Sequence, residues 1–130
     1  MSKPIADAGT DALTARIIEG AIAVLRALGP GLLETAYQAC LTWELIASGL
    51  RVVQQLPVPV VYRGHSLPVG YRVDLLVEGE VVVEIKSVNR LLPIVEAQAL
   101  TYLKLLGVRR ALILNFNVTL LRDGITRLVR

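Results

Sequence analysis

Apolar residues recur at helical spacing through the first third of the chain. Beginning at Asp11, a side chain suited to a helix N-cap, they fall every three or four positions and predict a helix over residues 11–28. The glycines and proline of residues 29–31 would end it. The same spacing returns over residues 32–48, a second predicted helix that Gly49 would terminate.

The pattern then changes from helical to alternating. Apolar residues alternate over residues 52–62, where two prolines predict an edge or irregular strand. Residues 64–66 have the composition of a turn. Two further strands are predicted over residues 69–77 and 81–86, and the short polar segment between them suits a hairpin connection.

The last part of the chain returns to a helix and then to strands. Pro93 opens a predicted helix that runs to about Leu106, residues 111–116 form an apolar run short enough for a buried strand, and residues 124–129 suit one more strand. This order predicts a single domain of the α/β (α+β) class with a mixed sheet flanked by helices. We expect residues 1–10 to be a flexible N-terminus.

Composition agrees with one compact domain. The chain has 130 residues, of which 54% are hydrophobic and 19% charged, so it can bury a core and is not a disordered chain. Its longest uncharged stretches are only about half as long as a membrane-spanning helix, and an acidic residue precedes any apolar run of secretory-signal length. We therefore expect a soluble, cytoplasmic protein with no membrane partner.

Several kinds of site are absent from the sequence. The single cysteine, Cys40, cannot form an internal disulfide or a cysteine zinc cluster, and its apolar neighbours predict packing in a helix. The only histidine, His65, lies in a predicted turn and suits a solvent-exposed role better than that of a catalytic base. The net charge of +3 is compatible with a phosphate-bearing partner, but a mild positive excess without a basic run is also common on ordinary surfaces, which is the interpretation we favour from charge alone.

Three charged residues interrupt the apolar strands. Glu84 and Lys86 lie two residues apart and share one face, while Asp74 joins them only if the hairpin loop has an odd number of residues, which we predict. Two adjacent carboxylates favour a cation between them, and oxygen ligands suit Mg²⁺ or Mn²⁺. Lys86 could then hold an attacking water. A structural salt bridge between Glu84 and Lys86 explains the same pattern.

An Asp followed on the next strand by Glu-X-Lys resembles the PD-(D/E)XK nuclease superfamily. Residues 31–37 match the Gly-X-X-Glu-X-X-Tyr motif of the GxxExxY proteins, a bacterial group within that superfamily. Other segments follow the pattern of this group in order, namely residues 44–45, 70–75, 84–86, 97–98, 102–103 and 115–117. The resemblance extends from about Ile17 to Arg130.

The resemblance implies a restriction-endonuclease-like core of order α-β-β-β-α-β and a nuclease site that uses Mg²⁺ (or Mn²⁺). The implied metal ligands are Asp74, Glu84, the Ile85 carbonyl and Glu34. The implied catalytic residues are Asp74, Glu84, Lys86, Glu34 and Gln98, and the substrate would contact Gln98, Tyr102 and Arg72. Two simpler interpretations stay open. Glu34 could be an acid that favours a helix N-terminus, and Tyr102 could be a core residue bonded to Gln98.

Two positions depart from the pattern of this group. Val95 and Asn89 stand where a histidine and an acid are common, which would weaken activity if those side chains hold phosphate or metal. Two functions remain open: a metal-dependent nuclease acting on nucleic acid, and a non-catalytic nucleic-acid- or protein-binding module that keeps the fold. A homodimer or a protein partner could supply further binding surface.

Overall fold

A computed structural model describes the backbone of residues 5–130 and the side chains of residues 11–130. The described helices are α1 (Ile5–Leu28), α2 (Glu34–Ala47), α3 (Pro93–Leu106) and the short 3-10 helix η1 (Leu121–Gly124). The strands are β1 (Val52–Pro57), β2 (Val60–Tyr62), β3 (His65–Leu67), β4 (Arg72–Val77), β5 (Val81–Lys86), β6 (Arg110–Asn115) and β7 (Ile125–Val129). Among these residues, no helix combines the length and apolar character needed to cross a membrane.

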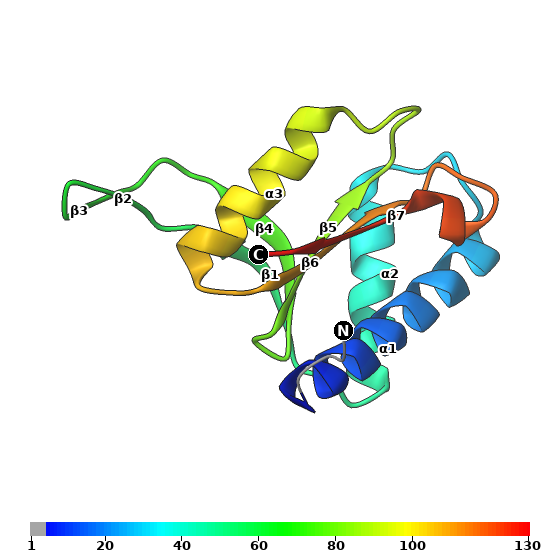
Figure 1. Ribbon diagram of the computed structural model, residues 1–130. Coiled ribbons are helices and arrows are strands. Elements are labelled where there is room, and N and C mark those ends of the chain that lie inside the picture. The colour runs from blue at the N-terminus through cyan, green and yellow to red at the C-terminus, as the bar shows by residue number, and fades with distance from the viewer. Residues whose placement is uncertain (1–4) are drawn as a thin grey trace.

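Five of the strands form one mixed sheet in the order β1-β4-β5-β6-β7. Strands β5 and β6 run parallel, and every other neighbouring pair in this sheet is antiparallel. Helices α1 and α2 cover one face of the sheet and α3 covers the other (Figure 1). The α/β (α+β) class and the mixed sheet flanked by helices are therefore confirmed.

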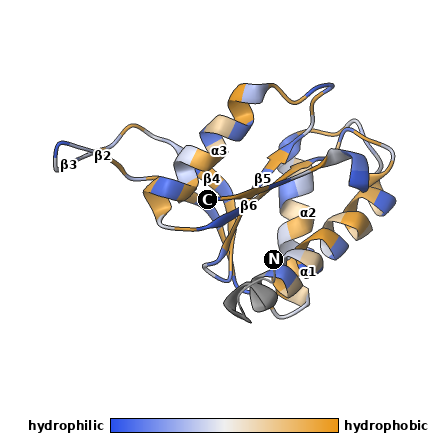
Figure 2. Ribbon diagram, in the orientation of Figure 1, coloured by the Kyte–Doolittle hydropathy of each residue, from blue (hydrophilic) through white to orange (hydrophobic). Residues whose placement is uncertain are grey.

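The core lies on both faces of the central strand β5. Val81, Val83 and Ile85 pack with α1 and α2, whereas Val82 packs on the opposite side with residues of α3 such as Leu103. This alternation follows from the two-residue period of a strand. Figure 2 shows the resulting concentration of hydrophobic residues along β5 and β6.

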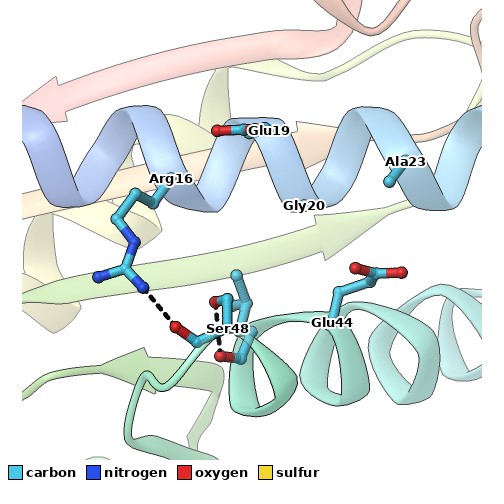
Figure 3. Close-up of a pocket in the computed structure, with 7 residues that line it drawn as sticks. Arg16, Glu19, Gly20, Ala23, Glu44 and Ser48 are labelled. Carbon is cyan, nitrogen blue, oxygen red and sulfur yellow. Dashed lines mark hydrogen bonds between the residues drawn. The ribbon is translucent and has the colours of Figure 1, made fainter.

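Helices α1 and α2 approach each other at Gly20. A Cβ atom added there would lie 3.2 Å from the Leu45 Cδ2 atom, so the small residue permits close packing. The Arg16 guanidinium donates a hydrogen bond to the Ser48 carbonyl at the end of α2. A cavity of about 350 Å³ between the two helices contains Arg16, Glu19 and Glu44 (Figure 3). At this cavity the Arg16 bond joins the middle of α1 to the C-terminal end of α2.

The start of α1 differs from the predicted boundary. The helix begins at Ile5, so Asp11 is an internal helical residue and not an N-cap. Its carboxylate pairs with Arg110 at 3.0 Å, a tertiary contact that a local capping signal cannot reveal. Of residues 1–10, which we expected to form a flexible N-terminus, positions 1–4 lie outside the described residues and positions 5–10 belong to α1. Cys40 is partly buried and packs against the core beneath α1 and α2, as expected.

The segment predicted as one irregular strand forms two separate elements. Strand β1 ends at Pro57, and the chain then continues into an arm in which β2 pairs with β3 apart from the main sheet (Figure 1). The predicted turn is also shifted, because residues 63–64 form the turn and His65 begins β3. Strand β4 begins at Arg72, three residues later than predicted.

Candidate active site

The β4–β5 hairpin has the odd loop that the sequence analysis predicted. Val77 pairs with Val81, so three residues, 78–80, connect the strands. The loop is attached to the start of β1, because the Glu78 carboxylate accepts the Arg51 backbone N–H at 2.6 Å and the Glu78 N–H donates to the Arg51 carbonyl at 2.9 Å. This register places Asp74 opposite Glu84.

Asp74 and Glu84 connect the two strands beyond the point where backbone pairing stops. The backbone ladder ends at the pair Leu75 and Val83. Beyond it, the Asp74 N–H donates to Glu84 Oε1 at 3.0 Å, and the Ile85 N–H donates to Asp74 Oδ2 at 2.7 Å. Each carboxylate thus accepts a backbone N–H in place of a backbone carbonyl. Hydrogen bonds to a charged acceptor are short and strong, so they fix both side chains in place.

The alternation of side chains along strand β4 also breaks at Asp74. Leu75 packs in the core beneath α1 and α2, whereas Val73 packs in the core beneath α3, so the alternation of the strand breaks between them. On the neighbouring strand, Gln55 has a left-handed backbone with φ of 51° and its side-chain amide donates to Asp74 Oδ1 at 3.3 Å. The sheet is therefore distorted on both sides of this carboxylate.

Glu84 is the buried member of the pair. Its side chain is 8% exposed, and burial followed by the charge of Asp74 raises its pKa from 4.5 to about 7. The Asp74 N–H and the positive charge of Lys86 lower this pKa, and the charge of Glu34 raises it. A cation beside the pair would stabilise the ionised form, because it would offset both burial and repulsion.

Lys86 lies at the end of β5 on the face of Glu84. Among the described side chains it makes no salt bridge with Glu84, and the two interact only through their longer-range field. The backbone around Lys86 is held by β6, since the Phe116 N–H donates to the Lys86 carbonyl at 2.8 Å. Buried Asn115 accepts the Val88 N–H at 3.1 Å and donates to its carbonyl at 2.9 Å. The structural salt-bridge interpretation of Glu84 and Lys86 is not supported by these contacts.

The Gly-X-X-Glu-X-X-Tyr motif shapes the loop between α1 and α2. Gly31 has φ of 98°, a conformation that favours glycine. The hydroxyl of buried Tyr37 donates to the Gly29 carbonyl at 2.6 Å and accepts the Leu32 N–H at 3.1 Å. The Tyr37 ring stacks on Phe116 with centroids 4.5 Å apart, which attaches this loop to the end of β6.

Glu34 is brought beside the end of β5 by the same loop. The Ser87 hydroxyl donates to the Leu32 carbonyl at 2.6 Å, and the Ser87 N–H donates to Glu34 Oε1 at 3.3 Å. Glu34 is also the first residue of α2, where an acid favours the helix N-terminus. The helix N-terminus interpretation therefore agrees with its position, while its role at the metal site stays a prediction. The charge of Glu34 contributes to raising the pKa of Glu84.

Tyr102 on α3 lies next to the pair but belongs to the core. It is buried in the cluster beneath α3, its hydroxyl is hydrogen-bonded with Gln98, and its ring tilts against Tyr71 with centroids 5.9 Å apart. Burial first, and then the charge of Glu84, raise the pKa of Tyr102. Gln98 therefore contacts Tyr102, while its predicted role beside Lys86 stays a prediction.

Arg72 approaches the carboxylates indirectly. Its guanidinium donates to the Gln55 carbonyl at 3.2 Å, and Gln55 in turn contacts Asp74. Sequence reasoning missed three residues of this region, Gln55, Ser87 and Asn115. Two of them carried a signal: Ser87 directly follows the Glu-X-Lys segment, and Asn115 lies in residues 115–117, which follow the pattern of the group. Gln55 carried none, because it acts through backbone distortion.

The oxygen atoms at this site fit a hard divalent cation. Asp74 and Glu84 supply carboxylates, and the Ile85 carbonyl faces β4 because the N–H and C=O of one strand residue point to the same side. Mg²⁺ is usually bound by one or two carboxylates together with water. Among the side chains from Asp11 onward, no three acids, histidines or cysteines gather closely enough to hold a metal by themselves. Glu34 thus stands outside the two-carboxylate cluster.

Comparison with known proteins adds one finding. The sequence model of a protein family described as the PD-(D/E)XK nuclease superfamily matches residues 11–128. The match includes β4, which carries Asp74, and β5, which carries Glu84. It also includes their neighbours α3 and β6. No curated protein and no solved structure matches the chain.

Proposed function

The chain belongs to the PD-(D/E)XK nuclease superfamily, and on this basis we propose that it is a metal-dependent nuclease that hydrolyses phosphodiester bonds of nucleic acid at Asp74 and Glu84. Family membership supports a nuclease-type function, and nucleases of this superfamily generally use divalent metal ions. One observation carries the assignment to this site. Two carboxylates are locked together at the point where β4 and β5 part, and one of them is buried.

The proposed cation is Mg²⁺ or Mn²⁺, held by Asp74, Glu84 and the Ile85 carbonyl. When bound, such an ion acts as a Lewis acid and makes water a better nucleophile at neutral pH. Glu34 would support the site from the end of β5, where the Ser87 N–H holds its carboxylate. The bonds to Asp74 and Glu84 keep both carboxylates oriented before substrate arrives.

Lys86 provides the positive charge on the same face. Its ammonium can donate hydrogen bonds to the attacking water or to a phosphate oxygen that gains negative charge during the reaction. The Lys86 ammonium is not engaged in an ion pair among the described residues, so these donors are available. Gln98 and Tyr102 would line the approach from α3, and Arg72 would contact a neighbouring phosphate.

A cleavage assay tests this function. Wild-type protein would be incubated with single-stranded DNA, duplex DNA and RNA in Mg²⁺ or Mn²⁺, beside Asp74→Asn and Lys86→Ala. Asp123→Asn in η1 is a matched control, since it removes an exposed acid from another part of the chain. We expect cleavage by the wild type and the control, with a loss of about a hundredfold in Lys86→Ala.

Two results would overturn the proposal. Cleavage that survives both Asp74→Asn and Lys86→Ala would show that the activity arises elsewhere. Nucleic-acid binding without cleavage, weakening as salt rises, would instead support a non-catalytic module that keeps the nuclease fold.

A further inference from the structure

A groove lies beside the carboxylate pair, between the β2–β3 arm and α3. It has a volume of about 340 Å³ and is lined by Val60, Tyr71, Ile94, Ala97, Gln98, Thr101, Tyr102 and Leu105. We call it the β2–α3 groove. Tyr102 connects it to the candidate active site, because this residue lines the groove and packs in one buried cluster with Val73, the residue before Asp74. A molecule in the groove would therefore sit next to the site.

The walls of the β2–α3 groove are flat and apolar. The Tyr71 ring is 48% exposed and tilts against Tyr102, and Ile94 on the opposite wall is 68% exposed. The Thr101 hydroxyl is turned to its own helix, where it donates to the Ala97 carbonyl at 3.0 Å. The side-chain polar groups that remain are the Gln98 amide and the hydroxyls of Tyr71 and Tyr102. An exposed aromatic ring with an amide beside it suits a planar heteroaromatic ligand that has polar edges.

Two arginines directly follow exposed tyrosines in the chain segments next to the groove. Arg72 directly follows Tyr71, and Arg63 lies at the turn of the arm, with its guanidinium over the Tyr62 ring at 5.6 Å from the centroid. An exposed aromatic ring with a cation next to it is typical of surfaces that stack a base and hold the adjacent phosphate. Of these two tyrosines only Tyr71 lines the groove, so Tyr71 and Arg72 form the pair that would meet a nucleotide there.

We propose that the β2–α3 groove binds an unpaired nucleobase next to the phosphate that reaches Asp74 and Glu84. This inference rests on the proposed nuclease function and specifies its substrate as a nucleic acid that is single-stranded at this position. The volume supports one base, because it lies at the lower end of small-molecule pockets, which span about 300–1,000 Å³. A base that is paired and stacked in a duplex could not enter it without being flipped out.

Binding measurements with an abasic probe test the groove directly. Fluorescein-labelled single strands would be titrated with full-length protein in Ca²⁺, together with a blunt duplex of the same sequence and a single strand that lacks all its bases. Tyr71→Ala removes the ring, and Ile94→Glu fills the groove with charge. Tyr62→Ala is the matched control, because Tyr62 is a 61% exposed tyrosine on the same arm that does not line the groove.

We expect the intact single strand to bind the wild type more tightly than the duplex does. Tyr71→Ala and Ile94→Glu should each weaken its binding about tenfold, and Tyr62→Ala less than about threefold. The base-free strand should bind wild type and Tyr71→Ala equally, since the ring then has nothing to stack on. Thermal melting of each variant would confirm that it is folded.

The groove and the nuclease function fail in different ways. Equal affinity of wild type and Tyr71→Ala for the intact strand would overturn the base groove, whatever the cleavage assay shows. A loss in Tyr71→Ala that is as large for the base-free strand would also overturn it, because the ring would then act on the backbone. Absence of cleavage together with Tyr71-dependent binding would overturn the nuclease function and leave base recognition standing.

Discussion

Asp74 and Glu84 each accept a backbone N–H from the opposite strand. The Asp74 N–H donates to Glu84 Oε1 at 3.0 Å, and the Ile85 N–H donates to Asp74 Oδ2 at 2.7 Å. The same two groups are therefore structural acceptors and a pair of like charges. A change that keeps the acceptor but removes the charge separates these two roles.

Asp74→Asn and Asp74→Ala should differ in stability without divalent ions. Asparagine keeps a carbonyl oxygen for the Ile85 N–H and relieves the repulsion with Glu84, so we expect it to be at least as stable as wild type. Alanine leaves that N–H without its partner and should lower the free energy of unfolding by about 1–3 kcal/mol. Urea unfolding in EDTA at about pH 8 measures both, and equal losses in the two variants would contradict this account.

The stability of the metal-free protein should fall as the pH rises through the range in which Glu84 ionises. The folded protein holds this proton more tightly than the unfolded chain, because burial and Asp74 raise the pKa from 4.5 to about 7. The stabilising contribution is complete below pH 4.5 and is lost as the pH approaches 7, a change of about 3 kcal/mol. Urea unfolding across this range in EDTA would measure the decline.

Glu84→Gln is the control for this pH dependence. It cannot ionise, so its free energy of unfolding should lack the decline between pH 4.5 and 7. Asp74→Asn should keep a smaller decline, since burial is the larger cause of the shift and the charge of Asp74 the second. A wild-type curve that is flat or rises over this range would show that Glu84 is not the buried acid described here.

Divalent ions should restore the stability that ionised Glu84 removes. At about pH 8, Mg²⁺ or Mn²⁺ at a hundred times its dissociation constant would add about 3 kcal/mol, because it binds the folded pair and not the separated carboxylates of the unfolded chain. Calorimetry would show a rise in the melting temperature for wild type and little for Asp74→Asn. An equal rise in both proteins would place the ion at another site.

The elements around the pair could be predicted because their signals are local. The odd hairpin loop follows from the position of the polar residues 78–80 between two apolar strands, and strand periodicity then brings Asp74 opposite Glu84. The start of α3 follows from Pro93 at its first position. These features need no knowledge of distant residues, which is why the sequence pattern and the structure agree.

The missed features depend on contacts between distant residues. Asp11 has the chemistry of an N-cap, yet its salt bridge with Arg110 uses that carboxylate inside a longer helix. The β2–β3 arm arises where Pro57 ends β1, and alternation alone cannot show that the strand leaves the sheet. The left-handed backbone of Gln55 has no sequence signal, because nothing in a glutamine predicts positive φ.

Tyr37 illustrates how the motif supports the site from a distance. Its hydroxyl holds both sides of the α1–α2 loop, through the Gly29 carbonyl and the Leu32 N–H. The same loop contacts Ser87 and carries Glu34 to the end of β5. We therefore expect Tyr37 to be a positioning residue that acts through Glu34, since its hydrogen bonds are to the loop and not to the carboxylate pair.

Tyr37→Phe should reduce activity through the position of Glu34. The ring would still stack on Phe116, while the loss of two hydrogen bonds should lower the free energy of unfolding by about 1–3 kcal/mol and loosen the loop. If cleavage falls because Glu34 moves, Tyr37→Phe should cost little further activity in a Glu34→Gln background, as coupled residues are not additive. Cleavage rates of both single variants and the double variant measure this coupling, with exposed Tyr62→Phe as the control. Additive losses would show that Tyr37 acts on the fold alone.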